Sequence, residues 1–151
     1  MNQRRQLLQH ATALAGLLAT AGLLPATAFA YAKDAFDAKS VADAMKAMGA
    51  GTPGESKDVS ITGPDIAENG AVVPLGVATT LPNVKQLVLL VEKNPNAVVA
   101  IFNVSEAVEP NFTTRAKLGQ SSDVYAIAIT NDNKAFYAKK EVKVTLGGCG
   151  G

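Results

Sequence analysis

The sequence has little of what enzymes and metalloproteins need: its 151 residues include one cysteine, Cys149, one histidine, His10, and no tryptophan. A lone cysteine cannot form a disulfide within its own chain. A zinc or iron centre takes about four cysteine or histidine ligands, so this sequence cannot build one. A cysteine enzyme also needs a positive group, usually histidine, beside its thiol. These shortages argue against a self-contained enzyme, and we expect neither a metal nor any other cofactor.

An excess of charge of one sign is also missing, because 14 lysines and arginines face 13 aspartates and glutamates. Proteins that bind nucleic acids neutralise phosphates with a strongly basic surface. The near balance therefore argues against a nucleic-acid partner.

The first thirty residues are typical of an export signal and are set apart from the fold. Arg4 and Arg5 precede an apolar stretch over residues 11–24, which is shorter than the roughly 20 residues of a membrane-spanning helix. Ala28-Phe29-Ala30 has the small-x-small pattern that signal peptidase cuts. We predict cleavage after Ala30, a periplasmic mature chain, and no membrane contact once the signal is removed.

The paired Arg4 and Arg5 resemble a twin-arginine signal, which exports proteins already folded. An ordinary Sec signal that happens to contain two arginines is the alternative. Cleavage in either case removes His10, so the mature chain has no histidine.

Residues 34–49 show helical spacing, with Phe36, Val41, Ala44, Met45 and Met48 on one face. Either Asp34 or Asp37 is a candidate N-cap, and Gly49 is a typical stop. We therefore predict a short N-terminal helix before the strands begin.

Short segments rich in valine and isoleucine, separated by turn residues, follow the helix. The predicted strands are 59–62, 71–79, 84–92, 98–104, 111–117, 123–130, 135–138 and 139–146. Asn131-Asp132-Asn133 is interpreted as a hairpin turn and not as a calcium loop. Strands at this spacing with no helices between them indicate an all-β fold, an antiparallel sandwich over residues 31–146.

The apolar runs at 87–91 and 98–102 show little alternation between strand faces. A strand that is apolar on both faces is covered on both faces. Either these runs form the core with the N-terminal helix over one face, or they meet a partner chain.

The chain ends on Gly147, Gly148, Cys149, Gly150 and Gly151, directly after a strand of regular alternation. Glycine has the greatest backbone freedom, so these residues predict a mobile arm whose thiol can reach about 10 Å beyond Leu146. An exposed free thiol is a liability in an oxidising compartment unless it is used. We interpret Cys149 as a point of covalent substrate attachment; a disulfide to another molecule and an incidental thiol are the alternatives.

The terminal Gly147–Gly151, the internal segment Ile66–Leu75 (IAENGAVVPL) and the twin-arginine-like signal together resemble the SoxY family of the sulfur-oxidising Sox system. The resemblance spans essentially the whole mature chain. It implies an immunoglobulin-like sandwich that pairs with a SoxZ-like subunit. It also implies a non-catalytic carrier of small sulfur compounds, held on Cys149, in thiosulfate oxidation. The enzymes SoxAX, SoxB and SoxCD would then bind the carrier transiently, one after another, and act on the group held by the arm.

Overall fold

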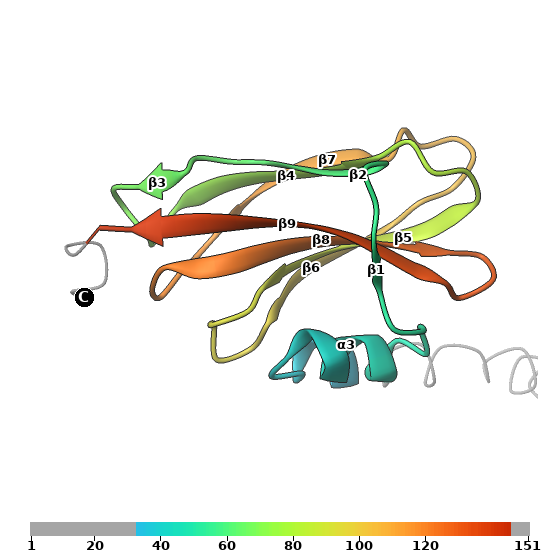
Figure 1. The fold of residues 1–151 in the computed structure, drawn as a ribbon, viewed down its shortest axis with the longest axis horizontal. Helices are drawn as coiled ribbons and strands as arrows, with labels where there is room; N and C mark the ends of the chain where they lie inside the picture. The colour runs from blue at the N-terminus through green and yellow to red at the C-terminus, as the bar shows by residue number, and fades with distance from the viewer. Residues whose placement is uncertain (1–32, 146–151) are drawn as a thin grey trace, which may run out of the picture. The chain divides into compact units, whose positions relative to one another are not determined.

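The computed structural model describes residues 33–145, so the predictions for the export signal and for residues 147–151 fall outside the described residues. Within the described residues, 33–36 are helical, and helix α3 (Val41–Ala47) and nine strands follow (Figure 1). The strands are β1 (Gly54–Glu55), β2 (Val59–Thr62), β3 (Ile66–Ala67), β4 (Val73–Thr79), β5 (Val84–Val91), β6 (Val98–Asn103), β7 (Asn111–Ala116), β8 (Ser122–Thr130) and β9 (Ala135–Val144).

The strands form two sheets that share one core. The larger sheet has the order β1-β9-β8-β5-β6, with β3 also on β9, and the smaller has the order β2-β4-β7. Alternate residues of each inner face, among them Leu75 on β4, Leu89 on β5 and Val124 on β8, are buried in the same apolar cluster. Because side chains alternate along a strand, every second side chain of β5 and β8 points to the opposite face of the larger sheet, and that face must be covered as well.

Helix α3 provides that cover. Val88, Leu90, Ile127 and Ile129 are fully buried but lie outside the cluster between the sheets. Figure 1 shows α3 on the side of the larger sheet that faces away from β2, β4 and β7. The buried side chains of α3 include Ala44 and Met45. The first interpretation of the 87–91 run, a core strand covered by the helix, is therefore confirmed, and residues 87–91 are not a partner-binding surface.

The predicted helix over 34–49 is wrong in its extent and its cap. Residues 33–36 are helical, but a break at 37–40 separates them from α3. Ser40 caps α3: its hydroxyl accepts a hydrogen bond from the Asp43 N–H and donates one to the Asp43 carboxylate. A serine N-cap outcompetes helix continuation because it satisfies an otherwise unpaired N–H. The helix ends as predicted, with Gly49 at φ +62°.

Two further corrections concern the strands. The predicted strands 135–138 and 139–146 are one strand, β9, which pairs without a break with β8 from Ala135 to Val142. No turn residue lies between Ala138 and Lys139, so nothing ends the ladder there. The fold is also not purely antiparallel, because the two-residue strands β1 and β3 both run parallel to β9. The Asn131–Asn133 turn between β8 and β9 is confirmed.

No helix within residues 33–145 is both long and apolar enough to span a membrane.

Candidate functional site at the root of the C-terminal arm

Strand β9 carries the chain to the predicted site of attachment. It ends at Val144, and Thr145 is the last described residue. Cys149 follows four residues later, so its Cα lies within about 14 Å of Thr145 whatever the path between them. The residues that hold Thr145 therefore decide where the cysteine can go. We call residues 65–72, 118–121 and 143–145 the arm root.

Strand β3 binds the end of β9 from its open edge. The Lys143 N–H donates to the Asp65 carbonyl at 2.9 Å, and the Thr145 N–H donates to the Ala67 carbonyl at 3.1 Å. The Thr145 hydroxyl adds a bond of 3.2 Å to the carbonyl of Glu68. Thr145 is thus fastened through both its backbone and its side chain immediately before the arm begins.

A charged pair anchors the entry to β3. The ammonium of Lys140 on β9 lies 2.9 Å from the Asp65 carboxylate and donates to the Gly63 carbonyl at 2.7 Å. The hydrogen bond from Lys140, reinforced by its charge, lowers the pKa of the exposed Asp65 carboxyl below its ordinary 3.8. Both the backbone and the side chain of Asp65 are therefore tied to β9.

The turn at Asn69-Gly70 presses against the same strand. The Asn69 side chain accepts from the Ala71 N–H at 2.9 Å, and the Gly70 carbonyl accepts from the Leu118 N–H at 2.7 Å. Gly70 is buried so closely that a Cβ there would lie 2.5 Å from the Leu118 carbonyl oxygen and 2.8 Å from Val144 Cγ1. Glycine is required at this position by the close approach and not by its backbone angles, because its φ is not positive.

Ser121 holds the last residue of β9 from the β8 side. Its hydroxyl accepts from the Val144 N–H at 2.8 Å and lies 3.5 Å from the Val144 carbonyl oxygen. The internal segment Ile66–Leu75 is thus explained in part: its first residues build one wall of the arm root. Sequence reasoning did not find Asp65, Ser121 or Thr145, since serine, threonine and aspartate carry no pattern that reveals such contacts.

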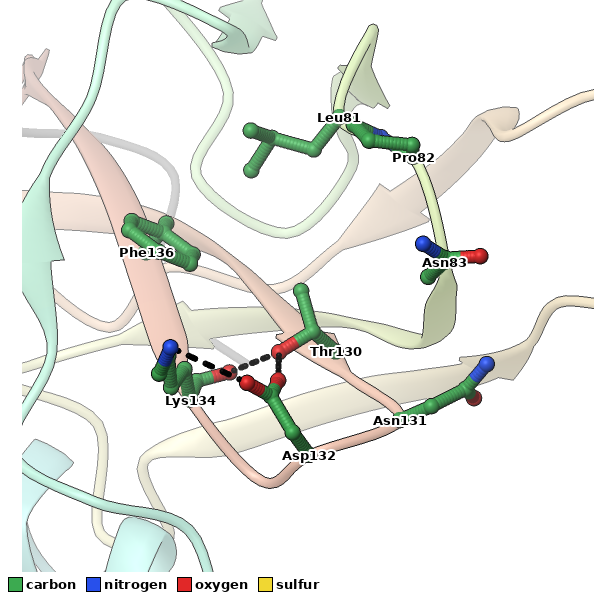
Figure 2. Close-up of a pocket in the computed structure, with 8 residues that line it drawn as sticks. All are labelled: Leu81, Pro82, Asn83, Thr130, Asn131, Asp132, Lys134 and Phe136. Atoms are coloured by element: carbon green, nitrogen blue, oxygen red, sulfur yellow. Dashed lines mark hydrogen bonds and ion pairs between the residues drawn. The ribbon is translucent and has the colours of Figure 1, made fainter.

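A pocket at the other end of β9 is too far away to serve the arm. Its cavity of about 490 Å³ lies between Leu81, Pro82 and Phe136 on one side and the β8–β9 turn on the other (Figure 2). β9 has ten residues and therefore spans about 33 Å, more than twice the reach of Cys149 from Thr145. The polar groups of the turn also satisfy one another, because the Lys134 ammonium lies 3.1 Å from the Asp132 carboxylate, and Thr130 donates to that carboxylate. Cys149 therefore cannot reach this cavity within its own chain.

The described residues 33–145 contain no histidine and no cysteine, and no group of three or more metal-ligating side chains gathers within them. The hydrogen bonds of the arm root hold Val144 and Thr145, and they fix the point at which the chain leaves the described fold.

The family model described as sulfur oxidation protein SoxY matches residues 44–149, more than half of the chain and up to Cys149. The chain belongs to the SoxY family. One solved structure similar to this SoxY-family chain is the sulfur carrier protein SoxY from Chlorobium limicola f thiosulfatophilum. It is 31% identical, with a TM-score of 0.60 over 70% of this chain and 96% of that one.

A variant of the superoxide reductase neelaredoxin from Ignicoccus hospitalis is similar at 23% identity, with a TM-score of 0.51 over 58% of this chain and 79% of that chain. At that identity the likeness concerns the fold alone. No curated protein matches this SoxY-family chain in sequence.

Proposed function

We propose that this protein carries sulfur intermediates covalently on the thiol of Cys149 and presents them to separate enzymes during thiosulfate oxidation. Family membership and the likeness to a SoxY sulfur carrier support the carrier role. The single observation that carries the arm mechanism is the arm root. Thr145 is fastened by Ala67, Glu68 and the neighbouring Val144–Ser121 contact, and the cysteine follows four residues later among glycines. A firm base and a glycine-rich extension let the thiol move while the body stays outside an enzyme.

The thiol suits this cargo because sulfur forms bonds to sulfur that can be exchanged and oxidised in steps. In the loading step, the Cys149 thiolate and the outer sulfur of thiosulfate form one S–S bond and together lose two electrons. The haem protein SoxAX is the oxidant. Water then attacks the terminal sulfur atom in a hydrolysis by SoxB: sulfate and two protons leave, and a persulfide stays on Cys149. SoxCD would oxidise that remaining sulfur.

Tethering keeps these reactive intermediates from diffusing away and raises their concentration at the next enzyme. Because the arm is short, each enzyme must approach the arm root closely. Ile66 and Val72 are 58% and 53% exposed there, which gives an approaching enzyme an apolar surface to touch.

The proposal includes a periplasmic location, reached through the signal at residues 1–30, with Arg4 and Arg5 as its twin-arginine pair. A SoxZ-like subunit would be the stable partner, since export of a folded pair accounts for a twin-arginine signal on a protein without a cofactor. The immunoglobulin-like class belongs to the same proposal and is supported by two facing sheets on one core.

The test is loading with a matched serine variant. Wild type and Cys149→Ser are each purified with the SoxZ-like subunit and incubated with SoxAX and thiosulfate. The intact mass of each protein is then measured by mass spectrometry. We expect a reductant-labile thiosulfate adduct on the peptide that contains Cys149 in wild type and none in Cys149→Ser, with equal thermal stability. A Cys149→Ser variant that still supports thiosulfate oxidation would overturn the proposal. A covalent dimer without cargo would favour the alternative, an exported scaffold or adhesion sandwich that uses Cys149 only for an intermolecular disulfide.

A further inference from the structure

The edges of the two sheets are not equally protected. An edge strand presents unpaired N–H and C=O groups, and proteins normally shield such edges with polar or charged side chains. Strand β2 exposes Ser60 and Thr62, and β7 exposes Asn111, Thr113 and Arg115. On the open edge of β9, β1 pairs with residues 136–137 and β3 with residues 143–144, and the stretch between them carries Lys139, Lys140 and Glu141. These edges follow the rule.

Strand β6 does not follow it. It ends the larger sheet, and its sequence from Val98 to Phe102 is five apolar residues in a row, with no charge and no proline. Val98 is buried, and the next four side chains are half-buried, so both faces of the strand are already largely covered near the edge. Within residues 33–145, this is the edge most open to another strand.

The backbone of β6 defines what could pair with it. The Val104 N–H donates to the Lys85 carbonyl, and the Val91 N–H donates to the Ala97 carbonyl, which fixes the residues of β6 that face β5. Because backbone groups alternate in direction along an antiparallel strand, those of Ile101 and Asn103 point away from the sheet. Among the described residues no backbone group pairs with them. A row of such donors and acceptors is matched only by another extended strand.

The surroundings of β6 suit a second β-sheet chain. On the core side, Phe102 stacks on Phe112 of β7 with ring centroids 4.5 Å apart, so an apolar wall joins the two sheets at this edge. β6 lies three strands away from β9, about 14 Å across the sheet. A chain docked on β6 therefore extends the sheet while leaving the opposite edge, where the arm root lies, free for enzymes.

We propose that the partner subunit of this carrier adds an extended, largely apolar strand along β6. That strand would pair with the outward backbone groups of Ile101 and extend the larger sheet by one strand. This proposal rests on the proposed function for the existence of that partner. The occupant is a strand of the SoxZ-like subunit, and a second copy of this chain is an alternative that the experiment separates.

The experiment compares hydrogen exchange in the full mature chain alone and co-expressed with its SoxZ-like subunit. We expect the partner to slow exchange in peptides covering 98–103 at least about tenfold, because the outward amides gain hydrogen bonds. Protection that appears only elsewhere, for example at 59–62 or 66–72, would overturn the proposal. Equal protection in the chain alone, together with a dimeric mass in light scattering, would assign the edge to a second copy.

A pair of variants tests the edge itself. Ile101→Lys places a charged side chain at the residue whose backbone groups form the proposed contact, and Ser60→Lys places the same charge on the exposed edge strand β2. We expect Ile101→Lys to weaken partner binding at least about tenfold and Ser60→Lys to leave it unchanged. Equal binding by both variants would contradict the proposal. Thermal unfolding of each variant shows whether that variant folds. The hydrogen-exchange measurement uses wild type and therefore tests the proposal even if a variant does not fold. Loading of Cys149, measured by mass on the same samples, reports separately on the carrier function.

Discussion

Gly70 offers the most demanding test of how the arm root is built. The substitution Gly70→Ala adds one methyl group, which would lie 2.5 Å from the Leu118 carbonyl oxygen and 2.8 Å from Val144 Cγ1. Ordinary contacts of this kind begin near 3.4 Å, so the Leu118 backbone must withdraw by about 0.9 Å. That carbonyl belongs to the same residue whose N–H donates to Gly70. The movement therefore strains the hydrogen bond as well as the packing.

Overpacking in a closed site costs about 1–3 kcal/mol, and a weakened backbone hydrogen bond adds about 1 kcal/mol. We expect Gly70→Ala to lower the free energy of unfolding by about 2–4 kcal/mol, which is about 8–16 °C in Tm for a domain of this size. Gly119→Ala is the matched control, because nothing lies within 4 Å of a Cβ there and its φ is not positive either. Its effect should stay within about 0.5 kcal/mol.

Denaturant unfolding of wild type and the two variants measures these values, and hydrogen exchange at the Thr145 amide reports on the arm root. The reasoning would be refuted if Gly70→Ala were as stable as wild type, or if Gly119→Ala were destabilised to the same degree. Faster exchange at Thr145 in Gly70→Ala alone would tie the loss to the base of the arm.

Three further changes have expected outcomes. Gly49→Ala should lower stability by about 1 kcal/mol in denaturant unfolding, because alanine is strained at φ +62°; an unchanged midpoint would contradict this. Ser121→Ala should speed exchange of the Val144 amide and lower stability by about 1 kcal/mol, and equal exchange in both proteins would show that the hydroxyl does not hold β9. Asp65→Asn tests the ion pair through pH: because the folded pKa of Asp65 is lowered, its stabilisation is present above the ordinary value of 3.8 and is lost as pH falls through the folded pKa. The difference in Tm between wild type and Asp65→Asn should therefore shrink as the pH is lowered from 6. A difference that stays constant would show that the Asp65–Lys140 ion pair does not cause it.

The sequence revealed the long strands because their signals are local. β2, β5, β7 and β8 begin and end within a residue or so of their predicted bounds, since valine-rich runs and turn residues mark them. The sequence did not predict β1 and β3, because a strand of two residues is too short to show an alternating pattern of apolar and polar residues. They exist only because the open edge of β9 offers a parallel ladder, and long-range pairing of that kind leaves no mark in a short segment.

The sequence likewise reveals some residues of the candidate site and not others. Cys149 and its glycines stand out by composition, and Asn69-Gly70 stands out as a turn. Nothing local shows that Gly70 contacts Val144, or that Ser121 holds that strand, because those residues are far apart in the chain. The apolar run at 87–91 was ambiguous for a physical reason: a strand covered by its own helix and one covered by a partner have the same composition.

The central claim, that Cys149 carries sulfur, is tested most directly on the protein from its native source. Mature protein is isolated from cells that are oxidising thiosulfate. Its intact mass is measured before and after treatment with a thiol reductant, and the modified peptide is sequenced. We predict additions that match sulfur or thiosulfate, confined to the peptide containing Cys149 and removed by the reductant. A bare thiol in both spectra, or a mass of twice the monomer that the reductant halves, would contradict it.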